Sequence, residues 1–307
     1  MKVASAGPAL QTRALSKTYG SRLAVDRLDL QVERAELFGF LGPNGAGKTT
    51  TIRMALGLIA PTNGSVEILG LDVRRHRSEV LPRVGALVES PALYGYLSGR
   101  DNLRVIGSQL GRVSEKRIDE VLEIVGLKGR DRDRVRTYSM GMKQRLGLGI
   151  ALLNNPELLI LDEPANGLDP AGIVEMRDLL RGLAAEGKTV FISSHVLSEV
   201  QQICTRVAII NHGRLVRLAP VAELLQDGGE FEVKVDQPDE LVAALKRQQW
   251  GVEARSEDGL VITASPDGRG RSLIKFLVDN GFSPDAVGAR HRDLEEIFLD
   301  LTEDPVK

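Results

Sequence analysis

Hydrophobic residues follow a strand-like pattern between residues 10 and 41. Apolar positions alternate or form short runs there, and we expect strands at Ala14–Tyr19, Leu28–Val32 and Leu37–Leu41. Gly20 and Ser21 separate the first two strands as a turn. The pattern therefore predicts an antiparallel β part in the N-terminal region of the chain.

Short apolar runs return later and alternate with helical patterns. Helices are expected at Ala171–Glu186 and Leu197–Cys204, each placed between two strand-like runs. Strands that alternate with helices indicate an α/β fold, in which a mostly parallel sheet is covered by helices. The further strands expected are Ser65–Leu69, Arg83–Glu89, Leu158–Leu161, Val190–Ser193 and Val207–Ile210.

The segment 90–153 differs from its surroundings because its apolar residues recur at helical spacing. Asp101–Leu110 and Glu115–Val125 are the clearest cases, and Gly126 ends the second of them. We interpret the segment as a helical insertion into the α/β core.

The last eighty or so residues carry a separate pattern of elements. The order is strand, helix, strand, strand, helix, strand and a closing helix, which predicts a small ferredoxin-like α+β domain. We place the domain boundary between residues 225 and 226, so that the domains are 1–225 and 226–307. The expected elements are Phe231–Val235, Asp239–Gln248, Gly251–Ser256, Leu260–Ala264, Arg271–Asn280, Asp285–Arg290 and a helix from Asp293.

Composition and charge exclude several classes of protein. The chain is 42% hydrophobic and 27% charged with a formal net charge of −2, which is ordinary for a globular protein and argues against a nucleic-acid-binding surface. The single cysteine, Cys204, allows no internal disulfide and fits a reducing compartment. No apolar stretch approaches the ~18 residues of a membrane span, and the N-terminus lacks the core of a signal peptide. We expect a cytoplasmic protein with no direct membrane insertion.

The strongest chemical signal follows the strand Leu37–Leu41. A glycine-rich turn and a helical pattern come next, which is the context that a phosphate-binding P-loop requires. Its glycines let successive backbone N–H groups point at phosphate oxygens, while Lys48 supplies a positive charge and Thr49 a hydroxyl ligand for Mg²⁺. The sequence therefore predicts a nucleoside triphosphate site. The loop consists of Gly42, Pro43, Asn44, Gly45, Ala46, Gly47, Lys48, Thr49 and Thr50.

Acidic residues end the strand-like run Leu158–Leu161. Asp162 is expected at the carboxyl end of this strand, where doubly wound sheets bind ligands, and is suited to hold Mg²⁺. Because side chains alternate along a strand, we expect Glu163 to point elsewhere and to accept a proton from an attacking water. His195 follows a neighbouring strand and is placed to bond a γ-phosphate or that water.

Two helix N-termini complete the candidate site. Ser139 opens a helix in the run Tyr138-Ser139-Met140-Gly141, and its hydroxyl with the first-turn amides forms an anion site. Asp169 precedes Pro170 and is expected to cap the next helix, with a possible contact across a subunit interface.

Together these motifs resemble the nucleotide-binding subunits of ATP-binding cassette (ABC) transporters over about residues 10–220. In that family a P-loop, a signature helix, an acidic strand end followed by a D-loop, and a histidine switch occur in the order found here. The resemblance implies that Tyr19 stacks on adenine, Glu163 is the catalytic base and His195 senses the γ-phosphate. It also implies that Thr49 and Asp162 hold Mg²⁺, and that Ser139 and Gly141 grip ATP bound by another copy.

Two departures from the family pattern define a branch. The usual signature Leu-Ser-Gly-Gly-Gln is replaced by Tyr138 to Met142, with the serine and the second glycine retained. Glu89 stands where a glutamine normally follows the strand; a carboxylate can face Mg²⁺ but cannot donate as an amide does. Both substitutions look like the bacterial drug-resistance and bacitracin-export branch.

The resemblance implies a specific working unit. One P-loop and one signature per chain suggest a homodimer or paired cassettes that enclose two Mg·ATP, coupled to a separate transmembrane permease at the inner face of the membrane. The expected function is therefore the ATPase subunit of an exporter. The alternatives are a soluble ABC ATPase acting on ribosomes or DNA, and an importer ATPase. The chain has a single cassette and its basic residues are not clustered, which argues against an ATPase that acts on ribosomes or DNA.

Overall fold

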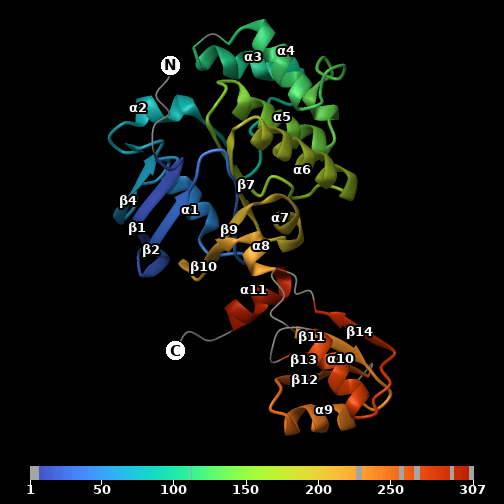
Figure 1. The fold of residues 1–307 in the computed structure, drawn as a ribbon. Coiled ribbons are helices and arrows are strands. Elements are labelled where there is room, and N and C mark those ends of the chain that lie inside the picture. The colour runs from blue at the N-terminus through green and yellow to red at the C-terminus, as the bar shows by residue number, and fades with distance from the viewer. Residues whose placement is uncertain are drawn as a thin grey trace. The chain divides into compact units, whose positions relative to one another are not determined.

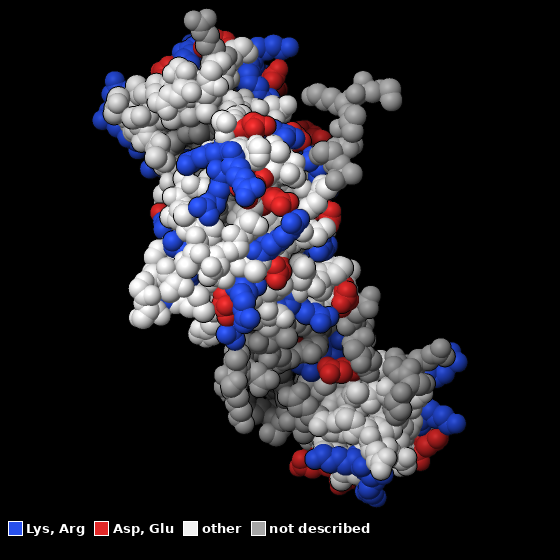
Figure 2. Space-filling view, turned by 90° about the vertical axis from the view of Figure 1, so that its left-hand side faces the viewer, with Lys and Arg blue, Asp and Glu red and all other residues white. Residues whose placement is uncertain are grey.

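The computed structural model describes residues 7–111, 113–225, 230–255, 259–265, 270–290 and 294–303. The chain divides into two units (Figure 1). The second unit is Ala222–Asp300, and the first contains the residues up to Val221 together with the end of the last helix from Leu301. The predicted boundary after residue 225 adjoins residues 226–229, which lie outside the described residues. Acidic and basic side chains are interspersed on the faces that Figure 2 draws.

A six-stranded sheet organises the first unit. Its order is β10-β9-β3-β8-β7-β6, and all neighbours are parallel except β9 and β10. Every residue of β3, β7 and β8 is buried, because helices cover one face of the central strands and a helix with a second sheet covers the other. The predicted parallel sheet is confirmed, and β10 is an addition that the sequence pattern did not indicate. The strands are β3 Leu37–Leu41, β6 Val84–Leu87, β7 Leu158–Asp162, β8 Thr189–Ser194, β9 Arg206–Asn211 and β10 Arg214–Pro220.

An antiparallel sheet packs against the same core, as predicted. Its order is β2-β1-β4-β5, with β1 Leu10–Tyr19, β2 Arg22–Val32, β4 Asn63–Ile68 and β5 Leu71–Asp72. Helix α1, Lys48–Ala55, contributes Ile52 and Met54 to one hydrophobic cluster with strands of both sheets. The ring centroids of Phe38 and Phe40 lie 5.8 and 5.3 Å from that of Phe191, and these contacts help to pack β3 against β8. Two short helical turns, α2 Arg77–Val80 and η1 Leu81–Arg83, lead into β6.

Helices build the predicted insertion and the cover of the large sheet. The insertion contains α3 Gly99–Gln109, α4 Glu115–Ile124, the turn η2 Val135–Thr137 and α5 Met140–Leu152. The hydroxyls of Ser98, Ser114 and Ser139 each accept a hydrogen bond from the third backbone N–H of the helix they precede, which fixes where α3, α4 and α5 begin. The covering helices are α6 Pro170–Ala185 and α7 Leu197–Ile203, followed by α8 Val221–Leu224.

The second unit has the strand and helix order predicted from its sequence. Its antiparallel sheet has the order β12-β13-β11-β14, so β13 separates the two strands that α9 connects, a split βαβ arrangement. One predicted strand ends at Ser256 and the last predicted helix begins at Asp293; both residues lie outside the described residues. The elements are β11 Glu230–Lys234, α9 Pro238–Arg247, β12 Val252–Arg255, β13 Leu260–Ala264, α10 Gly270–Asp279, β14 Ala286–Ala289 and α11 Leu294–Glu303.

Candidate nucleotide-binding site

The glycine-rich loop between β3 and α1 has a backbone that only glycine adopts easily. Gly45 and Gly47 have φ angles of 84° and 106°. A Cβ on Gly47 would lie 2.6 Å from the Ala24 carbonyl oxygen, and one on Gly42 would lie 2.6 Å from that of Ile210. The loop therefore depends on glycine both for its curl and for its close contact with neighbouring strands.

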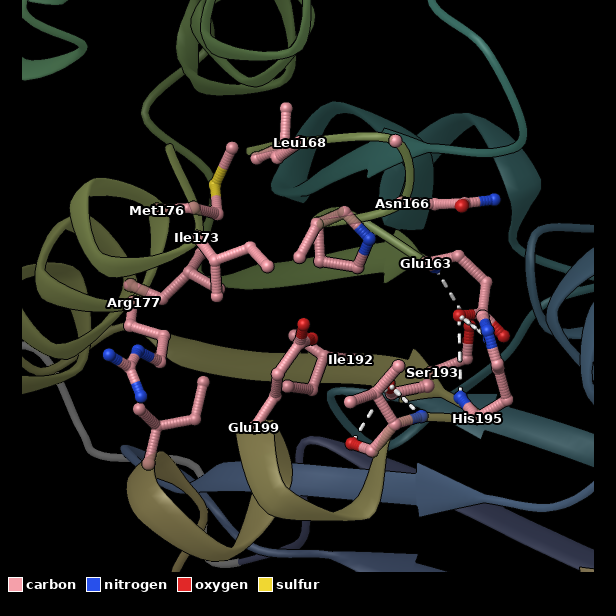
Figure 3. A pocket seen from close by; sticks show the side chains of 17 residues that line it. Glu163, Asn166, Leu168, Ile173, Met176, Arg177, Ile192, Ser193, His195 and Glu199 are labelled. Carbon is pink, nitrogen blue, oxygen red and sulfur yellow. Dashed lines mark hydrogen bonds and ion pairs between the residues drawn. The ribbon is translucent and has the colours of Figure 1, made fainter. Parts of the chain in front are cut away.

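Lys48, Glu163 and His195 form a connected chain of polar contacts. The buried Lys48 ammonium donates to the Gly42 carbonyl oxygen at 2.6 Å and pairs with Glu163 Oε1 at 3.2 Å. The other oxygen, Glu163 Oε2, lies 2.7 Å from His195 Nδ1 (Figure 3). A single carboxylate thus joins the P-loop lysine to the histidine after β8. This arrangement suits groups that act on the same phosphate and water.

The orientation of Glu163 has a cause other than the one predicted. Strand β7 ends at Asp162, so the alternation of side chains along a strand does not apply to the next residue. Glu163 has a φ of 50°, a left-handed conformation that costs a non-glycine residue of order 1 kcal/mol or more. Its N–H donates to the Ser193 carbonyl oxygen at 3.2 Å and to Ser193 Oγ at 3.0 Å. These two bonds hold the strained turn in place.

Thr49 and Asp162 lie together, as a shared magnesium site requires. Thr49 Oγ1 donates to Asp162 Oδ2 at 2.9 Å, and the Ser193 hydroxyl donates to Asp162 Oδ1. The Asp162 side chain is buried, so both of its oxygens are fixed. Hydroxyl and carboxylate oxygens are ligands that Mg²⁺ accepts, with the rest of its shell filled by water and substrate phosphates.

Glu89 is near this pair but engaged elsewhere. It lines the same hollow as Thr49 and Asp162, yet its carboxylate pairs with the Arg53 guanidinium and its side chain is 62% exposed. Within the described ranges, no three His, Cys, Asp or Glu residues are grouped to hold a metal ion by themselves. A magnesium ion here would thus depend on substrate oxygens as well as on protein ligands.

An open cleft of about 570 Å³ joins these groups, within the range of small-molecule sites. Tyr19 stands at its rim, 47% exposed, with the Lys17 ammonium 5.0 Å from its ring centroid. Arg22 and Asn166 also line the cleft, and the sequence analysis singled out neither. The lining comprises Tyr19, Arg22, Ala24, Pro43, Asn44, Gly45, Gly47, Lys48, Thr49, Thr50, Glu163, Asn166 and His195.

Three predicted site residues lie away from the cleft. Ser139 and Asp169 act as helix caps: Ser139 Oγ accepts from the Met142 N–H at 3.2 Å, and Asp169 Oδ1 accepts from the Gly172 N–H at 2.9 Å. Neither they nor Gly141 line the space next to Lys48. For these residues to contact a nucleotide, that nucleotide must be bound in the cleft of another copy of the chain.

Ser193 is the principal residue that sequence analysis missed. It is fully buried, donates to Asp162 and accepts from the backbone N–H of Glu163. A hydroxyl directly after the apolar run Val190–Ile192 was the signal available in the sequence.

Several proteins of known name are similar to most of this chain. The ABC transporter family model matches residues 25–166. The bacitracin transport ATP-binding protein of Bacillus licheniformis is 43% identical over 95% of this chain and 96% of its own length. The lantibiotic transport ATP-binding protein of Streptococcus pyogenes is 41% identical over 67% of this chain and 89% of its own length. The daunorubicin resistance ATP-binding protein of Streptomyces coeruleorubidus is 36% identical over 97% of each chain.

Solved structures share the fold of the first unit. An ATP-binding subunit of an ABC transporter matches with a TM-score of 0.64 and 28% identity, covering 72% of this chain and 93% of its own. A dimeric ATP-binding cassette bound to ADP and phosphate matches with a TM-score of 0.63 and 24% identity, covering 69% and 98%, and shows the fold alone. Over the part of the chain that the structure describes, every helix is too short or too polar to cross a bilayer.

Proposed function

The chain belongs to the ABC transporter family as the ATP-binding and ATP-hydrolysing subunit of an exporter, and on this premise we propose that it powers the export of a peptide antibiotic. Its partner is a separate membrane permease, and the chain lies on the inner face of the membrane. The proposed mechanism of ATP hydrolysis rests on one observation: the Glu163 carboxylate contacts both Lys48 and His195.

We assign the chemical roles from these contacts. Glu163 acts as the general base toward the attacking water, since its carboxylate lies beside Lys48 and is oriented by His195. Lys48 and the loop amides bind the phosphates, and Tyr19 stacks on the adenine. Thr49 and Asp162 hold Mg²⁺, which stabilises the charge on the transferred phosphoryl group. Glu89 is a further candidate ligand of that ion.

Two copies complete the active unit in this proposal. Ser139, Gly141 and Asp169 lie outside the cleft of their own chain, so they are available to the nucleotide bound by a partner. The first-turn amides of α5 carry partial positive charge, which suits a γ-phosphate. Closure of two cassettes over Mg·ATP, and their opening after hydrolysis, would move the permease.

The choice of a peptide antibiotic rests on the relatives. The two bacitracin transport proteins are 43% and 41% identical to this chain over nearly their full lengths. A lantibiotic transport protein is also similar over the cassette. A daunorubicin resistance relative supports an anthracycline as the second candidate substrate.

Resistance in a sensitive host tests the substrate. The chain is co-expressed with the membrane protein that purifies with it, and we expect the inhibitory concentration of bacitracin to rise several-fold. Lys48→Ala, which removes the phosphate-binding ammonium, is expected to abolish the rise. Resistance to daunorubicin without resistance to bacitracin would replace the peptide by an anthracycline, and an undiminished effect of Lys48→Ala would contradict an ATP-driven exporter.

A further inference from the structure

A second pocket lies behind the loop that carries Glu163. It is enclosed by β8, α6, α7 and the loop, with a volume of about 160 Å³ (Figure 3). Glu163, Asn166 and His195 line both this pocket and the nucleotide cleft, so they form the partition between the two spaces. The pocket is comparable in size to a cavity of ~150 Å³ that binds benzene.

Most of the pocket wall is apolar. Branched aliphatic side chains from three elements and one methionine form it, and such walls favour an apolar ring or chain. Figure 3 shows the side chains from α6 facing those from β8 across the space. These wall residues are Leu168, Ile173, Met176, Leu180, Ile192 and Ile203.

Two polar groups in the pocket, Arg177 Nε and the Glu199 carboxyl, have no hydrogen-bond partner among the described residues. Arg177 Nε is buried and makes no hydrogen bond within the described part of the chain. The Glu199 carboxyl makes no hydrogen bond or ion pair with any described residue, and no contact within 4.0 Å joins it to Arg177. Burial is the main cause that raises the pKa of Glu199, and the Glu163 carboxylate adds to it; the charges of His195 and Arg177 act in the opposite direction but do not outweigh these effects. Buried polar groups are usually satisfied, so the buried Arg177 Nε calls for an explanation, and the half-buried Glu199 carboxyl lines the same space.

Another arginine on the same helix shows the contrast. Arg181, one turn beyond Arg177 on α6, donates to the Gln202 carbonyl oxygen at 2.7 Å and pairs with Asp178 at 3.3 Å. It lies outside the pocket lining. On this helix the guanidinium of Arg181 is therefore bonded to protein acceptors, whereas Arg177 Nε, which lines the pocket, is not.

We propose that this pocket binds a small, mostly apolar molecule that carries a primary amide. Its apolar part packs on Ile173, Met176 and Ile192, its carbonyl oxygen accepts from Arg177 Nε, and its NH₂ group donates to the Glu199 carboxyl. An amide supplies both an acceptor and a donor on one small group, which matches the two unpartnered side chains. Because the partition includes Glu163 and His195, an occupant alters turnover of ATP; this consequence alone rests on the roles proposed above.

Benzamide is a suitable probe, and the full chain is the protein to test. We expect saturation-transfer NMR to detect binding with a dissociation constant on the order of 1 mM, a value ordinary for so small a ligand. Arg177→Met should weaken binding at least fivefold, and Glu199→Leu likewise. Arg181→Met, the matched control on the same helix, should leave the affinity unchanged. If Arg177→Met fails to fold, Arg177→Lys keeps the charge but moves the donor and should also weaken binding.

Several results would overturn this site. Absence of benzamide binding at 10 mM, equal affinity for the Arg177 and Arg181 variants, or displacement of benzamide by ADP would each do so. A further check uses the thermal midpoints of Arg177→Met, Glu199→Leu and the double variant without ligand. Additive changes support two independent unpartnered groups, whereas strong non-additivity means that the two pair with one another and leave no site.

Discussion

Glu163 contacts two other residues of the proposed catalytic site. Its left-handed backbone is held by Ser193, and its two carboxylate oxygens reach Lys48 and His195. A strained backbone conformation of this kind persists only when the surrounding structure holds the turn in place. Glu163, which does not continue the regular geometry of β7, is thus the residue that contacts both Lys48 and His195.

Replacement of this carboxylate tests its role as a base. We expect Glu163→Gln to slow ATP hydrolysis by about 10²-fold or more, because the amide keeps the shape but cannot accept the proton. Nucleotide affinity should change little. Phosphate release and binding of a fluorescent ATP analogue measure the two quantities. Glu186→Gln, at the exposed end of α6, is the control, and equal rates for both variants would contradict the assignment.

Glu89 is tested by the dependence of hydrolysis on magnesium. If its carboxylate faces the ion, Glu89→Gln should raise the half-saturating Mg²⁺ concentration a few-fold. Loss of the ion pair with Arg53 should alter stability by less than about 1 kcal/mol, since both side chains are more than one-third exposed. An Arg53→Gln variant separates the two effects. An unchanged magnesium dependence would remove Glu89 from the metal site.

Cys204 offers a reporter of local opening. Burial is the main cause that raises the pKa of its thiol well above the ordinary range, and the Glu36 carboxylate adds to it. Because the thiolate is the reactive form, labelling by a thiol reagent at pH 8 should be at least tenfold slower in the native protein than in urea. Equal labelling rates would mean that the end of α7 is open in solution.

At the scale of elements, the sequence predicted what local pattern determines. Runs of apolar residues identified β3, β7 and β8, and Ser139 marked the start of α5. Strand β10 was missed because a register shift between Leu215 and Arg217 breaks its alternation and only Ala219 is buried, so no period-2 apolar pattern results. The contacts of Lys48 with Glu163, 115 positions apart, depend on strand order, which no local pattern encodes.

The helical insertion depends on one arginine. Arg100 donates to Asp131 at 2.8 Å and to Asp119 at 2.6 Å, linking α3 to α4 and to the loop that follows. Burial alone would raise the pKa of Asp131, but the hydrogen bond and charge of Arg100 outweigh it and lower the pKa. The insertion is therefore held partly by a largely buried ion pair.

Arg100→Met should lower the free energy of unfolding by about 1–3 kcal/mol, because Asp131 is left buried without its charge partner. Lys116→Met, on an 88% exposed side chain, should change it by less than ~0.5 kcal/mol. Urea denaturation followed by circular dichroism measures both. A carboxyl with a lowered folded pKa stabilises above its unfolded pKa, so the effect of Arg100→Met should shrink as the pH falls below about 4. A constant difference across that range would contradict the pairing.

The whole molecule brings distant motifs to one edge of one sheet. Strands β3, β7 and β8 are adjacent and parallel, so their carboxyl ends place Lys48, Glu163 and His195 together. Ser139 and Gly141 remain outside that cleft, so in the proposed function their contacts with nucleotide are made to the ATP of a second copy. Pairing of two chains is accordingly the central claim about how ATP drives this protein.

The mass of Glu163→Gln in solution tests that claim most directly. Because this variant should bind Mg·ATP without hydrolysing it, light scattering coupled to size exclusion should give twice the mass of one chain with saturating Mg·ATP, and one chain mass with ADP. The added change Ser139→Arg should return the ATP-bound sample to one chain mass. A single-chain mass for Glu163→Gln, with ATP shown to be bound, would contradict the account.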